Sequence, residues 1–344
     1  MTMRRSHNCM RKPLWLEMAA DNTPERNRHR PGSGRWNEMV CGLRLPVVVA
    51  PMFLVSGPRL VVAAGRQGLI GSFPTAYPRT LEELDRWFEE IELGLAQQPA
   101  GSAPYAANLI VHPTNERMDA ELDLICKHEV PIVIASVGNP ARIVARVHDY
   151  GGVVLTDVAR IDHARKAVDR GVDGLILLCA GAGGHTGWIN PFSFVRAVRA
   201  FYDGPIILAG GIADGSSLHA ARTLGADLAY MGTRFIAAAE SDAKPEYQQM
   251  IVDSTADDIV LTAAVSGLPA NWLKKSLELR GYTDPNQTAS GGFSFSEKLK
   301  AWKDVWGAGH GVGATLSTTT VQDIVFQLEG EYLQACGVGG VVVL

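Results

Sequence analysis

The stretch Ala180-Gly181-Ala182-Gly183-Gly184-His185-Thr186-Gly187 decides how this chain is interpreted. It follows the apolar run Gly174–Leu178, which is typical of a strand buried on both faces. Glycines on both sides of one histidine allow a tight turn and a close approach of the backbone to a ligand. Loops that follow the strands carry the chemistry of parallel α/β folds, so we expect His185 at the rim of a sheet or barrel. The structural alternative is a glycine-rich connector whose histidine faces water.

Short apolar runs recur from Cys41 onward, and a loop and a helical pattern follow each of them. Their apolar residues are consecutive rather than alternating, as in strands that are covered on both faces. Helix signals lie between the runs: Thr80-Leu81-Glu82-Glu83 is a capping box, and Asn139-Pro140 places proline in a first helical turn. Gly171 and Gly225 end two helices in the same way. The runs are Pro46–Ala50, Gly68–Ser72, Ala106–Val111, Pro131–Ala135, Val153–Thr156, Gly174–Leu178, Pro205–Ala209 and Leu228–Met231.

This succession predicts an α/β fold, a (β/α)8 TIM-type barrel, because the number of runs matches its strands. A doubly wound parallel sheet is the alternative. After the last run the regular pattern stops, and we expect a mostly helical insertion over the barrel mouth, followed by helices at Ser296–Trp306 and Thr318–Gln334. The expected division is a flexible basic extension (1–40), a barrel (41–239 and 307–335), a helical lid for the substrate (240–306) and a tail (336–344).

Composition narrows the function classes. The chain has 344 residues and a net charge of −4, which offers no electrostatic attraction to nucleic acid or to an anionic membrane. Its longest apolar run, Leu45–Val55, is interrupted by prolines and is too short to span a bilayer. The cysteines are odd in number, scattered and without a C-x-x-C pair, which argues against a disulfide framework or a zinc site. We therefore expect a cytoplasmic protein.

Two further glycine loops follow the last two runs, Gly210-Gly211-Ile212-Ala213-Asp214-Gly215 and Gly232-Thr233-Arg234-Phe235. In barrels, the loops after strands seven and eight commonly bind a phosphate through backbone N–H groups and a helix N-terminus. Glycines that only allow close packing of strand and helix are the structural alternative. Asp157 also follows a predicted strand, whereas His112 and His310 are expected to be polar walls of the mouth.

These motifs, together with Leu45–Met52 and Asn108–Val111, resemble the nitronate monooxygenases, formerly called 2-nitropropane dioxygenases. The resemblance extends over roughly Cys41 to Gln334. It implies a barrel that binds FMN, with His185 as the general base and Gly211, Gly232 and Thr233 at the flavin phosphate. The cofactor-binding positions that it implies are Ala50, Met52, Asn108, Gly183, Gly210, Gly211, Met231, Gly232 and Thr233.

The implied reaction is the oxidation of nitronates or nitroalkanes with dioxygen to a carbonyl compound and nitrite. A histidine side chain ordinarily titrates near pH 6.5, which suits removal of the acidic proton beside a nitro group. The related flavin-dependent enoyl-acyl-carrier-protein reductases share these loops, so an NAD(P)H-dependent enoyl-thioester reductase is one alternative. A flavin-binding protein without turnover is the other. The expected partners are a small-molecule substrate and dioxygen, and a homodimer is left open.

Overall fold

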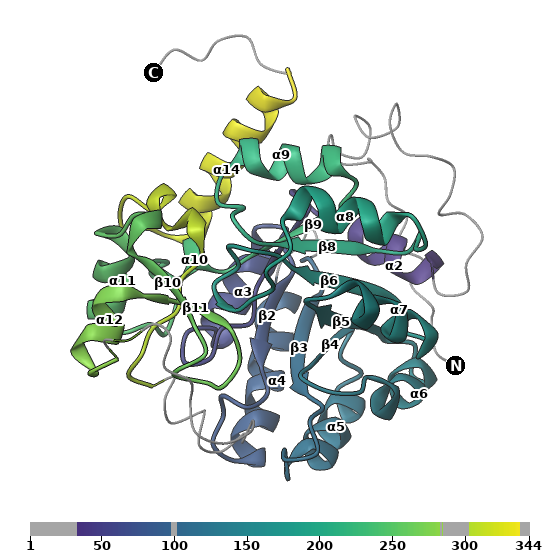
Figure 1. Cartoon of the computed structure of the whole chain (residues 1–344). Coiled ribbons are helices and arrows are strands. Elements are labelled where there is room, and N and C mark those ends of the chain that lie inside the picture. Colours follow the sequence, from purple (N-terminus) through teal and green to yellow (C-terminus); the bar gives the residue numbers. More distant parts are fainter. Residues whose placement is uncertain (1–32, 98–101, 283, 285–302, 338–344) are drawn as a thin grey trace.

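Eight parallel strands form a closed barrel in the computed structural model, which describes residues 33–97, 102–282, 284 and 303–337 (Figure 1). The strands are hydrogen-bonded in the order β1-β9-β8-β6-β5-β4-β3-β2. Between β1 and β2 the ring closes through a 2.8 Å bond from the Val49 N–H to the Ile70 carbonyl oxygen. The predicted (β/α)8 TIM-type barrel is thus confirmed. The strands are β1 (Val47–Val49), β2 (Gly71–Pro74), β3 (Tyr105–Ile110), β4 (Ile132–Ser136), β5 (Val153–Val158), β6 (Gly174–Leu178), β8 (Ile206–Ala209) and β9 (Leu228–Met231).

A helix packs outside the barrel after each strand, and the structure contains the helix caps that the sequence predicts. The Thr80 hydroxyl oxygen accepts a hydrogen bond from the Glu83 N–H at 3.1 Å, which begins α4. Gly171 and Gly225 have φ values of +83° and +110°, which glycine adopts without steric cost. No helix in the described part of the chain is long and apolar enough to cross a bilayer. These outer helices are α3 (Pro58–Arg66), α4 (Leu81–Ala96), α5 (Met118–Lys127), α6 (Ala141–Asp149), α7 (Ile161–Asp169), α8 (Pro191–Arg199), α9 (Gly215–Leu224) and α14 (Val321–Ala335).

The strands look continuously apolar because each one faces two cores. On β4, Ile132 and Ile134 join the cluster that fills the barrel, whereas Val133 joins the cluster between the sheet and the helices. The second strand begins later than predicted, since Gly68 forms a left-handed turn with φ +77° and only Ile70 and the residues after it reach the sheet. A strand prediction from hydrophobicity alone includes such buried turns.

The segment after β9 contains helices and also a β-hairpin that the sequence did not lead us to expect. Strand β10 (Ile259–Thr262) pairs antiparallel with β11 (Ala270–Leu273), and β11 pairs with β7 (Gly184–His185). Figure 1 shows this hairpin with α11 and α12 on one side of the barrel. The helix expected at Ser296–Trp306 falls largely outside the described residues, as does the tail from residue 338. The helical elements of this segment are α10 (Thr233–Ile236), α11 (Pro245–Val252), the 3-10 turn Ala256–Asp258, α12 (Lys274–Leu279) and the 3-10 turn His310–Ala314.

The end of the expected flexible extension is instead an ordered helix, α2 (Ser33–Val40). Its Trp36 and Val40 side chains are only 4% and 8% exposed, and they join the core cluster that links the inward-facing strand residues with α3, α9 and α14. The basic composition of the first residues concealed this short apolar face. Helix α2 therefore belongs to the barrel, and residues 1–32 lie outside the described part.

We predict that Trp36→Ala lowers the free energy of unfolding by about 3 kcal/mol, the usual cost of removing a buried aromatic side chain. Trp188→Ala is the matched control, because Trp188 is 82% exposed and should change stability by less than about 0.5 kcal/mol. Urea denaturation followed by circular dichroism measures both. Equal effects of the two substitutions would show that α2 does not contribute to the core.

Candidate active site

A cavity of about 260 Å³ opens at the carboxyl ends of the barrel strands. Residues at the ends of β1, β3, β4, β5, β6, β8 and β9 line it, so the fold brings together loops that are far apart in the sequence. Met231 is the exception among the predicted positions, since its side chain is buried in the barrel core and its carbonyl oxygen accepts the Ala50 N–H at 2.9 Å. The predicted positions that line the cavity are His185, Ala50, Met52, Asn108, Gly183, Gly210, Gly211, Gly232 and Thr233.

The loops after β8 and β9 form one wall, which we call the glycine cradle (Gly210, Gly211, Gly232 and Thr233). Gly210 and Gly211 have φ values of +127° and +71°, where a side chain would strain the backbone. No atom lies within 4 Å of the position that a Cβ on Gly211 would take, so a side chain there would project into the open cavity. The cradle can therefore admit an anion close to backbone N–H groups.

Arg234, which follows the cradle, does not line the cavity. Its guanidinium is buried and donates hydrogen bonds to the carbonyl oxygens of Ala213 and Ala314, and at 2.6 Å to the side chain of Gln327. Burial lowers the pKa of Arg234. This side chain thus links the backbone at Ala213, the backbone of the 3-10 turn His310–Ala314 and the Gln327 side chain of α14.

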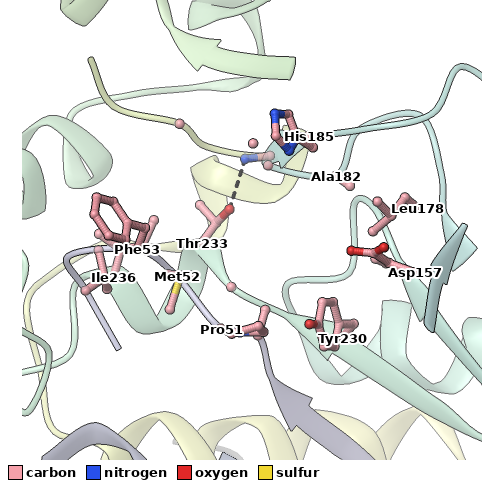
Figure 2. Close-up of a pocket in the computed structure, with 18 of the residues that line it drawn as sticks. Pro51, Met52, Phe53, Asp157, Leu178, Ala182, His185, Tyr230, Thr233 and Ile236 are labelled. Carbon is pink, nitrogen blue, oxygen red and sulfur yellow. Dashed lines mark hydrogen bonds between the residues drawn. The ribbon is translucent and has the colours of Figure 1, made fainter. Parts of the chain in front are cut away.

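A third glycine-rich segment, Gly307–Gly311, completes the wall next to the cradle. The Gly309 N–H donates to the Thr233 hydroxyl oxygen at 2.9 Å, the dashed line in Figure 2, and the His310 N–H donates to the Gly181 carbonyl oxygen at 3.0 Å. A Cβ on Gly309 would lie 2.6 Å from that carbonyl oxygen, so only glycine fits. The distance of this segment from the cradle along the chain hid its place in the site.

His185 reaches the cavity from β7, and the insertion holds it there. The pairing of β7 with β11 is reinforced by the Asn271 side chain, which donates to the Ala182 carbonyl oxygen at 2.7 Å. The His185 Nε2 lies 3.3 Å from the Ser266 hydroxyl oxygen, and that hydroxyl donates to the Leu268 carbonyl oxygen at 3.0 Å. Because the single hydroxyl proton of Ser266 is directed at the Leu268 carbonyl, its oxygen can accept a hydrogen bond from a protonated Nε2 of His185.

Large apolar side chains form the side of the cavity opposite Asp157 and Tyr230 (Figure 2). Phe53 and Ile236 are labelled there. Two further lining residues come from beyond the barrel: the rings of Tyr247 and Trp306 stack with centroids 5.0 Å apart and an interplanar angle of 14°. Such a wall favours an apolar group on the substrate.

A chain of hydrogen bonds crosses the ends of β3, β4 and β5. The Asn108 amide donates to the Ser136 hydroxyl oxygen at 2.6 Å, and the Ser136 hydroxyl donates to the Asp157 carboxyl at 2.7 Å. Burial raises the pKa of Asp157 to about 6, although the Ser136 hydroxyl opposes the shift. Tyr230 faces Asp157 across this corner (Figure 2), and its buried hydroxyl has a raised pKa.

The described residues that line the cavity include no lysine or arginine. His112 and His310, predicted as walls of the mouth, are also not among the lining residues. His310 is exposed, whereas His112 is half-buried, and its ring interacts with the Thr114 hydroxyl at 2.8 Å. Both lie in loops that were predicted to be near the mouth, but neither side chain reaches this cavity.

Comparison with known proteins agrees with this geometry. The family model for nitronate monooxygenase matches residues 38–301. The chain is similar to a Mycobacterium tuberculosis protein named (3aS,4S,5R,7aS)-5-hydroxy-7a-methyl-1-oxo-octahydro-1H-indene-4-carboxyl-CoA dehydrogenase, with 29% identity over 69% of this chain and 65% of that protein. It is also similar to a probable nitronate monooxygenase of Staphylococcus aureus, with 26% identity over 67% of this chain and 77% of that protein.

Solved structures share the fold. FabK from Thermotoga maritima is 25% identical, with a TM-score of 0.72 over 88% of this chain and 97% of that one. Nitroalkane oxidase from Streptomyces ansochromogenes is 23% identical, with a TM-score of 0.72 over 88% and 98%. The matched family region contains the barrel, the His185 loop and the glycine cradle. The chain therefore belongs to the nitronate monooxygenase family and is a flavin oxidoreductase of that family.

Proposed function

We propose that this chain is an FMN-dependent enzyme that oxidises alkyl nitronates and nitroalkanes with dioxygen to a carbonyl compound and nitrite. The observation that supports this most is His185 at the rim of a cavity whose wall is the glycine cradle. FMN, when bound, would supply the transfer of electrons from the substrate to dioxygen. The protein would supply position, a proton acceptor and an enclosed pocket.

The cavity fits FMN by its chemistry. Gly211, Gly232 and Thr233 would hold the phosphate through backbone N–H groups, which suits a cradle without a lysine or arginine. Ala50, Met52, Asn108 and Gly183 line the remainder and would contact the ribityl chain and the ring. These assignments agree with the single cradle, since FAD would need a place for a second phosphate and an adenosine.

His185 would act as the general base toward a neutral nitroalkane. In the tautomer that donates from Nε2 to the Ser266 hydroxyl oxygen, Nδ1 would be the basic nitrogen of the neutral imidazole. The pairing of β7 with β11 fixes the backbone of the histidine. Together the two contacts hold the base in one orientation, as proton transfer requires.

The purified protein should be yellow and should release FMN on denaturation. In Gly232→Asp the new carboxylate would lie against the flavin phosphate, so we expect at least about tenfold weaker FMN binding. Gly232→Asn is the control of equal size without the charge. The φ of −111° suits both residues, and the Met52 side chain, whose Sδ would lie 3.2 Å from the new Cβ, must shift equally in both. Mass spectrometry of the released cofactor and fluorescence titration of the apoprotein measure the two effects. Release of FAD would contradict the assignment.

His185→Ala should retain the flavin but lose roughly 10²–10⁴-fold in the rate of proton removal from a neutral nitroalkane. Oxidation of a pre-formed nitronate should fall much less, because that substrate has already lost the proton. Stopped-flow reduction of the flavin with each substrate separates the two steps. His112→Ala is the matched control, since this half-buried histidine does not line the cavity. Equal losses on both substrates would assign His185 to binding rather than to base catalysis.

A second candidate is an NAD(P)H-dependent reductase of an enoyl thioester. The apolar wall of Phe53, Tyr247 and Trp306 favours it, because a nitronate is a small anion and needs little of this surface. The relatives named as a carboxyl-CoA dehydrogenase and as FabK point the same way. In this reaction His185 would position or protonate the substrate.

Anaerobic mixing distinguishes the two candidates. We expect a small alkyl nitronate to bleach the flavin rapidly and NADH or NADPH to do so slowly or not at all, because no described lining residue offers a cation to a nicotinamide phosphate. Stopped-flow absorbance of the flavin band measures each rate under identical conditions. Rapid bleaching by NADPH with no response to nitronates would establish the reductase instead.

A further inference from the structure

Asp157 is a carboxyl group in the wall of the proposed flavin cavity, at the end of β5. Two groups from β4 and the turn after it are directed at it: the Ser136 hydroxyl, which donates at 2.7 Å, and the backbone N–H of Val137. Val137 has a φ of +53°, a left-handed conformation that is costly for a β-branched residue. The backbone is therefore held in a strained turn at the point where it meets this carboxyl.

The groups around Asp157 leave its charge uncompensated. Its neighbours in the sheet are β4, which contributes Ser136 and Val137, and β6, which contributes the apolar Leu178. Across the corner β9 contributes Tyr230, whose hydroxyl has a raised pKa. The remaining titratable lining residues in the described part are His185 and Tyr247, and no lining residue is a lysine or arginine.

We propose that Asp157 takes up one proton from solvent when the flavin in this cavity is reduced. The inference rests on the flavin site of the proposed function, but not on the identity of the substrate. Two electrons from a reductant add negative charge to the cavity, and a second anion at Asp157 would repel it. Binding a proton at the Asp157 carboxyl removes that repulsion, and the Ser136 hydroxyl can then turn toward another acceptor.

The pKa of Asp157 lies close enough to neutral pH for flavin reduction to change the protonation of its carboxyl group. Burial has already raised the pKa of Asp157 to about 6, so the carboxyl is mostly ionised at pH 7 before reduction. Added negative charge raises the pKa further and moves it through neutrality. Because the coupling is reciprocal, the ionised carboxylate must lower the midpoint potential of the flavin at alkaline pH. This effect must disappear below about pH 6, where the carboxyl is already protonated before reduction.

The test is a redox titration of the holoenzyme with dithionite and indicator dyes from about pH 5 to 9. The plot of flavin midpoint potential against pH should be steeper in the wild type than in Asp157→Asn, by up to one proton per two electrons, between about pH 6 and the higher pKa that Asp157 has in the reduced enzyme. The variant should have the higher potential at pH 8 and the same potential at pH 5, since an amide resembles the protonated acid. Asp119→Asn removes a charge from an exposed side chain and should follow the wild type.

Ser136→Ala provides a second, independent variant. The substitution removes a hydrogen bond that stabilises the carboxylate and therefore raises the pKa of Asp157. The plot of potential against pH for Ser136→Ala should merge with that of Asp157→Asn at a higher pH than the wild-type plot does. Infrared difference spectra of reduction should show a newly protonated carboxyl group in the wild type but not in Asp157→Asn. Parallel plots for the wild type and both variants would overturn the proposal. If Asp157→Asn does not retain flavin, two other results would overturn the proposal. These are a plot of potential against pH that is the same in Ser136→Ala as in the wild type, and no newly protonated carboxyl group in the infrared difference spectrum of the wild type.

Discussion

The site depends on one contact between two stretches of backbone. Residues Gly307–Gly311 lie against the loop that carries His185, so close that a Cβ on Gly183 would come within 2.8 Å of the Gly309 nitrogen. The same segment donates a hydrogen bond to Thr233 in the glycine cradle. Because no side chain fits between these backbones, the spacing of the three loops is set by glycine and not by side-chain packing. His185 and the cradle are held at a fixed separation as a result.

Charge is distributed around this contact in an unusual way. The cation nearest the cradle in sequence, Arg234, is used on carbonyl oxygens behind it. Backbone dipoles would therefore have to hold the anionic end of the proposed cofactor, while the Asp157 carboxyl lines the same cavity. A cavity of this kind screens charge poorly, so each proton bound or lost inside it acts on its neighbours. The cavity has few polar side chains among the described residues, so each of them strongly influences the electrostatic potential inside it.

The barrel was predictable because each strand, buried on two faces, leaves a continuous apolar run, and because caps such as Thr80 and Gly225 act locally. The glycine cradle was predictable for the same reason, as its residues directly follow two of those runs. The positions of Ser266 and Trp306 were not, since they depend on the pairing of β7, a strand of two residues without any periodic pattern. Helix α2 was hidden by a basic segment, and the burial of Asp157 depends on neighbours from other strands. The roles of the candidate residues stay predictions.

The closure of the barrel also has a consequence for synthesis on the ribosome. Strand β9 pairs with β1 on one side and with β8 on the other, so it fills the last gap in the ring. Until it emerges, β1 and β8 present open strand edges, which are templates for aggregation. At ordinary elongation rates the 22 residues from Ala209 to Met231 take about 1–4 s to add. Any sheet that has formed by that interval would still have two open edges, which a chaperone could cover.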